Sequence, residues 1–107
     1  MRLNNEQFIK IKQGTKTIEL RLYDVKRKAL RVGDLIEFTN RATNEKIDTI
    51  VTKLDRYKDF KELYPNYSKE ELGYNKNANA NPNDMLAYYS EEEITKYGVI
   101  AISIKLK

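Results

Sequence analysis

The sequence predicts an α+β, mainly β fold: one antiparallel, partly closed β-barrel with short flanking helices, occupying residues 1–107 as a single domain. Three observations lead to this prediction. The chain has only 107 residues, which is an ordinary size for one domain. Its patterns run from one helix through several strands to short helical segments and a last strand. This order lacks the regular strand–helix–strand alternation that produces a parallel sheet.

The first helix is expected between Asn4 and Gly14. Asn4 or Asn5 can cap its start, because a short polar side chain there accepts a hydrogen bond from a free backbone amide. Gly14 can adopt the left-handed conformation that ends many helices. Phe8 and Ile11 are three positions apart and share one face, so this face is expected to pack on the core.

The first strand is expected at residues 16–23, where side chains alternate between two rows. One row is apolar after its first residue (Lys16, Ile18, Leu20, Leu22), and the other is mostly polar (Thr17, Glu19, Arg21, Tyr23). A basic connection with one helical turn then leads to Gly33 and Asp34. Two further strands are expected at residues 34–40 and 47–57, joined by a turn, and the second of them is rich in β-branched residues.

Short helical segments are expected after residue 57. The first should stop before Pro65, and a capping box of Ser68 and Glu71 indicates a second helix. Residues 75–83 contain many asparagines and one proline, which indicates a loop.

Two more helical segments and a closing strand complete the chain. Asn83 is the expected cap of one helix, and Ser90 with Glu93 forms the capping box of the next, which Gly98 ends. The closing strand is then expected to turn an inner face of isoleucines to the core (Ile100, Ile102, Ile104).

The composition excludes several kinds of chemistry. The chain has no cysteine and no histidine, which removes disulfides, thiolate nucleophiles, serine–histidine triads and the usual zinc sites. No spacing typical of a calcium loop is present, so neither a metal nor a cofactor is expected. The N-terminus lacks the apolar stretch of a signal peptide, and no run approaches membrane-spanning length. A cytoplasmic protein without membrane contact is therefore expected.

The net charge of +4 is concentrated in one part of the chain. Residues 10–31 contain two acidic residues against a larger basic set (Lys10, Lys12, Lys16, Arg21, Lys26, Arg27, Lys28, Arg31). A one-sided positive field suits a phosphate-bearing partner such as RNA. Clusters of this size also occur on ordinary soluble, mildly basic surfaces.

The strongest candidate site is the motif Gly14-x-Lys16-x-x-Glu19-x-Arg21. Glu19 and Arg21 share one face of the predicted strand, about 7 Å apart, and Lys16 lies at its entrance. Arginine offers a planar fork and lysine a mobile charge for phosphate. The alternative is an exposed ion pair worth about 0–1 kcal/mol, and spacing by itself favours this alternative.

Three basic residues beside Tyr23 can extend the site (Lys26, Arg27, Lys28). Tyrosine and arginine can stack on unpaired bases. A solvated, lysine-rich loop explains the same residues equally well.

The motif residues resemble those of small bacterial ASCH-domain proteins, which are related to PUA-like β-barrels. The signature G-x-K-x-x-E-x-R is met by Gly14, Lys16, Glu19 and Arg21. The following step L-x-x-G-D-x-I-x-F is met from Leu30 to Phe38, and a tyrosine-rich helix with a closing strand is met from Met85 to Ile104. The resemblance implies a barrel with a cleft beside the first strand that holds Lys16, Glu19 and Arg21.

The resemblance implies RNA or a modified nucleotide as ligand, bound through a basic cleft. It also implies an enzyme alternative, in which Lys16 and Glu19 are catalytic in hydrolysing RNA or a modified nucleoside such as N4-acetylcytidine. Relatives with the latter activity have a Lys-x-x-Thr pattern with a threonine nucleophile. This chain has Glu19 at that position, and a carboxylate is a poor substitute for a hydroxyl nucleophile.

A third possibility is a protein-interaction module that uses the tyrosine-rich C-terminal half. The sequence indicates no oligomeric state.

Overall fold

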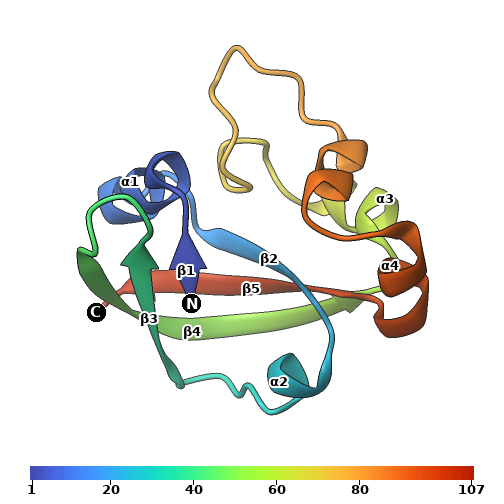
Figure 1. Cartoon of the computed structure of the whole chain (residues 1–107), viewed down its shortest axis with the longest axis horizontal. Helices are drawn as coiled ribbons and strands as arrows, with labels where there is room; N and C mark the ends of the chain where they lie inside the picture. The colour runs from blue at the N-terminus through green and yellow to red at the C-terminus, as the bar shows by residue number, and fades with distance from the viewer.

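A computed structural model describes all 107 residues and shows one five-stranded sheet curled into a half-barrel (Figure 1). The strand order is β1-β3-β4-β5-β2. The strands are β1 (Arg2–Leu3), β2 (Ile18–Leu22), β3 (Leu35–Asn40), β4 (Lys46–Tyr57) and β5 (Val99–Leu106). This architecture confirms the predicted mainly β fold with short helices.

The helices are short and lie at the ends of the strands (Figure 1). They are α1 (Asn5–Gln13), α2 (Val25–Lys28), α3 (Phe60–Leu63) and α4 (Glu91–Tyr97), with 3-10 turns η1 (Tyr64–Asn66) and η2 (Pro82–Ala87). Helix α1 is as predicted: the Asn4 side chain accepts a hydrogen bond from the Gln7 amide, and Gly14 ends the helix at φ 84°. The predicted Ser90–Glu93 capping box of α4 is also confirmed.

The sheet has one parallel pair that the sequence did not indicate. Strand β1 pairs with β3 in parallel, with Arg2 opposite Thr39, and all other pairs are antiparallel. Two residues are too few to show a periodicity, so this strand could not be recognised. Because β1 and β2 are the two edges of a curled sheet, they approach each other, and Arg21 Nη2 lies 3.4 Å from the carbonyl oxygen of Arg2.

Two apolar clusters cover the two faces of the sheet. One lies inside the half-barrel with α1 packed on it (Leu3, Phe8, Ile11, Ile36, Phe38, Val51, Ile100, Ile102, Ile104). The other lies between the sheet and the segments after β4 (Ile18, Leu20, Leu22, Phe60, Leu63, Tyr64, Leu72, Met85, Val99, Ala101). The inner face predicted for β5 is therefore confirmed, but β5 is buried on both faces.

The register of β2 shows which row of its side chains faces the half-barrel. Ile18, Leu20 and Leu22 pack on the outer cluster rather than in the half-barrel. Glu19 pairs with Ile102 and Arg21 with Ile100, so both charged side chains share a face with the interior of the half-barrel. The polar row of this strand is therefore not a solvated rim.

The helix expected after Ser68 is wrong, because the segment forms turns. The capping-box hydrogen bonds are present between Ser68 and Glu71. However, the Glu71 carbonyl accepts the amides of Thr17 and Ile18, both at 3.1 Å, so it is engaged by the start of β2 instead of a further helical turn.

Two expected boundaries also differ from the structure. The helix expected at Asn83 is the 3-10 helix η2, whose cap is Asn81. Strand β2 begins at Ile18 rather than at Lys16.

Replacing Phe8 should strongly destabilise the fold. Phe8 is 0% exposed in the inner cluster, so Phe8→Ala should reduce the free energy of unfolding by about 3–5 kcal/mol. Its neighbour Ile9 is 39% exposed, and Ile9→Ala on the same helix is the matched control, expected to cost less than about 1 kcal/mol. Urea denaturation measures both values. Equal losses in the two variants would contradict the burial of Phe8 in the inner cluster.

Candidate functional site

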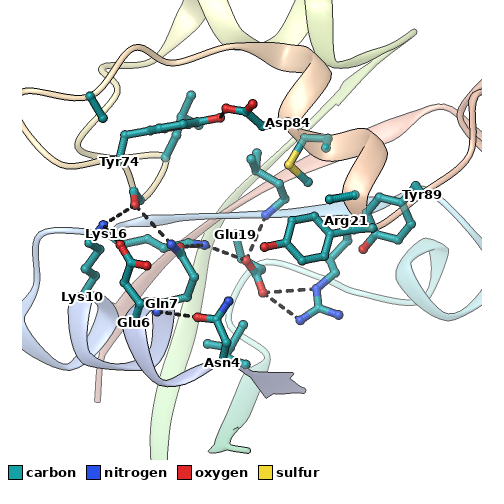
Figure 2. Close-up of a pocket in the computed structure, with 18 of the residues that line it drawn as sticks. Asn4, Glu6, Gln7, Lys10, Lys16, Glu19, Arg21, Tyr74, Asp84 and Tyr89 are labelled. Carbon is teal, nitrogen blue, oxygen red and sulfur yellow. Dashed lines mark hydrogen bonds and ion pairs between the residues drawn. The ribbon is translucent and has the colours of Figure 1, made fainter.

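A cavity of about 730 Å³ lies where the two edges of the curled sheet meet. Its lining comes from β1, β2, α1, the Asn-rich loop after Gly73 and η2 with the tyrosines that follow it. Figure 2 shows Glu19 in the middle of this site, with α1 residues on one side and Tyr89 on the other. The cavity lies beside β2, whose residues Glu19, Leu20 and Arg21 line it.

Glu19 lies between two cations at the base of the cavity. Its Oε1 is 3.1 Å from Lys16 Nζ, and its Oε2 accepts hydrogen bonds from Arg21 Nε at 3.1 Å and Nη2 at 2.8 Å. The side chains of Lys16, Glu19 and Arg21 are 6%, 4% and 16% exposed. We call these three residues the buried ion cluster, and their burial excludes the exposed-pair alternative.

The start of β2 explains why Lys16 reaches Glu19. In a regular strand these residues would point to opposite faces. The chain leaves α1 at Gly14 in a left-handed conformation and enters the strand only at Ile18. Strand alternation therefore does not apply to Lys16, and the row predicted for it is wrong.

Outside the motif, Gln7 bonds the ammonium of Lys16, and Gly73 in turn bonds Gln7. Gln7 Oε1 accepts a hydrogen bond from Lys16 Nζ at 2.7 Å, and Gln7 Nε2 donates to the carbonyl of Gly73 at 3.2 Å. The same carbonyl accepts from Lys10 Nζ at 2.7 Å. These contacts connect α1, the turn at Gly73 and the buried ion cluster. Gln7 and Gly73 carry no sequence signal for this role, because 66 residues separate them.

Electrostatics favour the ionised forms of Glu19 and Arg21. Burial alone would raise the pKa of Glu19, but the adjacent Lys16 ammonium and Arg21 guanidinium outweigh burial and hold that pKa below its usual range. Burial alone would lower the pKa of Arg21, but Glu19 raises it. A carboxylate with a lowered pKa that already accepts hydrogen bonds is a weak general base. Its geometry therefore suits the orientation of Lys16 and Arg21.

Tyrosines form the other wall of the cavity (Tyr64, Tyr74, Tyr88, Tyr89). Tyr89 lies beside Arg21 (Figure 2), and burial raises the pKa of its hydroxyl. The Tyr74 hydroxyl donates to Asp84 Oδ2 at 2.8 Å and lies 2.8 Å from the Tyr64 hydroxyl. Tyr88 is the exposed member of the set, at 63%.

The other sequence candidates lie away from this cavity. Lys26, Arg27 and Lys28 are on α2 and do not line it. Arg27 Nη1 bonds Asp24 Oδ2 at 3.0 Å, and Lys28 Nζ lies 5.6 Å from the centre of the Tyr23 ring. Most C-terminal tyrosines proposed for a protein interface pack against the outer cluster.

No group of acidic residues could hold a metal ion, and none of the helices has the length and apolar character needed to cross a membrane.

The ASCH domain model matches residues 1–107, the whole chain. The chain belongs to the ASCH domain family. The resemblance of the motif to the ASCH family is thus confirmed, and the half-barrel is consistent with the PUA-like fold. RNA binding is the activity ascribed to ASCH domains.

Two solved structures resemble the chain over nearly its whole length. The crystal structure of hypothetical protein PH0355 is 32% identical, with a TM-score of 0.83, and the match covers 100% of this chain and 96% of that one. The solution NMR structure of protein PF0455 from Pyrococcus furiosus is 29% identical, with a TM-score of 0.73 and coverage of 99% and 97%. No protein with a curated description matches the chain.

Neutralising Glu19 should destabilise the fold in a pH-dependent way. Glu19→Gln leaves two buried cations without their anion and should cost about 3–5 kcal/mol at neutral pH. The folded pKa of Glu19 lies below the ordinary 4.5, so its stabilisation is complete above pH 4.5 and is lost as pH falls through the folded pKa.

Chemical denaturation of the parent and of Glu19→Gln at several pH values tests this prediction. The difference between their unfolding free energies should narrow as the pH falls below 4.5. Glu45→Gln is the control, because its pair with Lys12 is exposed (52% and 44%) and should contribute less than about 1 kcal/mol. A gap that stays constant into acid would contradict the coupling of Glu19 to its two cations.

Replacing Gly73 should disturb Lys16, although the two residues are far apart in the sequence. At φ 101°, a Cβ on residue 73 would collide with Gln7 Oε1 and lie 2.9 Å from Lys16 Cδ. Gly33 has a similar φ of 95° with nothing within 4 Å, so Gly33→Ala measures the backbone strain alone, about 1–2 kcal/mol. Gly73→Ala should lose more stability than Gly33→Ala, and adding Gln7→Ala should recover part of the excess. Thermal unfolding of the variants measures this, and equal losses at the two glycines would refute the close contact.

Proposed function

We propose that the cavity binds RNA or a nucleotide, with Lys16 and Arg21 as the contacting cations and Glu19 as their support. The observation that carries the proposal is the buried ion cluster at the base of a cavity walled by tyrosines. Charged side chains this deeply buried are rare unless they are paired, and a cavity beside them lets a ligand share their hydrogen bonds. Buried, perturbed charges in a cavity are typical of functional sites.

The size and chemistry of the cavity suit a nucleotide. Its volume of about 730 Å³ falls within the range of about 300–1,000 Å³ that is usual for small-ligand pockets. Tyrosine rings on one wall can stack on a base. Further cations line the cavity on the side of β1 and α1 (Arg2, Lys10, Arg41), where phosphate oxygens can be received.

The basic residues of α2 would act differently. Lys26 and Lys28 are exposed and outside the cavity, so they would add to the field that attracts RNA without direct contact at the cavity. Arg27 is engaged by Asp24. The hydrolase alternative receives less support from the geometry, because Glu19 is surrounded by donors and is not free to accept a proton from a nucleophile.

Replacing Arg21 should weaken RNA binding. Arg21→Gln should reduce affinity for a short RNA by about 1–3 kcal/mol, the usual scale of a hydrogen bond to a charged group. Affinity of the parent should also fall as salt rises, because bound phosphates release counterions. Fluorescence anisotropy over a salt series measures both effects.

The matched control is Lys105→Gln, which removes one positive charge from an exposed position on β5 outside the cavity. It should bind RNA nearly as well as the parent. Failure of the parent to bind any RNA at low salt, or equal affinity of the Arg21→Gln variant, would refute the proposed function.

A further inference from the structure

The buried ion cluster carries an excess of positive charge. It contains two cations, Lys16 and Arg21, and one carboxylate, Glu19. The other acidic residues that line the cavity are engaged elsewhere: Glu6 Oε1 is 3.0 Å from Lys10 Nζ, and Asp84 accepts the Tyr74 hydroxyl. An uncompensated charge at low solvent exposure is costly, and an anion in the cavity would compensate it.

The carboxylate of Glu19 has no free capacity for a ligand. Oε1 is approached by Lys16 Nζ at 3.1 Å and by the Leu20 amide at 3.2 Å. Oε2 accepts the Nε and Nη2 donors of Arg21. The four acceptor positions of a carboxylate are thereby used, so an incoming amino group finds no acceptor there.

The two cations do have unused donors. Lys16 Nζ has three hydrogens, and its partners are Gln7 Oε1 and Glu19 Oε1. Arg21 donates to Glu19 and Arg2 from Nε and Nη2, which leaves Nη1 free of both, and the Tyr89 hydroxyl is the other polar group beside the guanidinium. Nη1 is not a buried atom without a partner. Nη1 is therefore open to the cavity or its solvent. The base of the cavity offers donors and positive charge, which is the complement of an anion rich in oxygen.

The position of the cluster favours the end of a nucleic acid over its middle. Arg21 lies at the join between the sheet edges, where its Nη2 approaches the Arg2 carbonyl at 3.4 Å. A phosphodiester carries one negative charge and a sugar on each side. A terminal phosphate monoester carries about two charges near neutral pH and exposes three oxygens. The single surplus charge of the buried ion cluster and the further cations Arg2 and Arg41 on the cavity lining can together match its two charges, and its three oxygens suit the free donors.

We propose that Lys16 and Arg21 receive the terminal phosphate of a nucleotide or of an RNA end, while the attached nucleoside lies against the tyrosine wall. This inference rests on the proposed function and specifies which part of the ligand reaches the buried ion cluster. The cavity then distinguishes phosphorylated ends from hydroxyl ends.

The test compares three short RNAs of one sequence: a 5′-phosphate, a 3′-phosphate, and hydroxyls at both ends. Fluorescence anisotropy should show one phosphorylated RNA binding about tenfold or more tightly than the hydroxyl RNA. Arg21→Gln should remove this advantage, whereas Lys105→Gln should keep it. Competition by uridine monophosphate, but not by uridine, provides a measurement on the unmodified protein that is independent of how the variants fold.

The outcomes separate this inference from the proposed function. Equal affinity for the three RNAs, or an advantage that persists in folded Arg21→Gln, overturns the terminal phosphate site and leaves RNA binding in place. If calorimetry shows that uridine monophosphate binds whereas uridine and RNA do not, the result supports the phosphate site and overturns RNA binding as the function. Absence of binding by all RNAs and by the mononucleotide overturns both.

Discussion

Glu19 lies on the inner face of the half-barrel, where a single unpaired charge would cost several kcal/mol. The carboxylate is retained there because Lys16, Arg21 and the Leu20 amide all direct donors at it. This arrangement constrains its surroundings. The segment between the end of α1 and the start of β2 must direct Lys16 inward. Arg21 must extend from β2 toward β1, the opposite edge of the sheet. Lys16, Glu19 and Arg21 therefore form the polar base of the cavity.

The location of the site follows from the incomplete closure of the barrel. A curled sheet with five strands retains two edges, and unpaired edge groups need partners. On the β2 side, the Leu20 amide bonds the Glu19 side chain, and the Thr17 and Ile18 amides bond the Glu71 carbonyl. On the β1 side, the Arg2 carbonyl meets Arg21. Side chains and the turn at Glu71 therefore bond the edge groups that backbone pairing leaves free. The cavity lies beside these contacts.

The segment after Gly73 connects the meeting point of the two sheet edges to the C-terminal half of the chain. Tyr74 reaches both the Asn81 carbonyl and Asp84, and Lys69 Nζ donates to the Ala78 carbonyl at 2.9 Å. The Asn-rich loop is thus fastened at several points and forms one wall of the cavity. In the proposed function, this wall sets the space available to a nucleoside, while the buried ion cluster sets the charge that the ligand must carry.

The sequence by itself determined the parts of the molecule that depend on local pattern. The caps at Asn4 and Ser90, the termination at Gly14 and the alternation of β5 are encoded within a few residues, so local rules predicted them. The motif from Gly14 to Arg21 likewise contains three residues that line the cavity, Lys16, Glu19 and Arg21. Tertiary structure decided the burial of Glu19, because alternation shows which residues share a face but not which face is covered. It also decided the contacts of Gln7, Gly73 and Tyr89, since these residues meet the motif only after the sheet has curled and brought distant segments together.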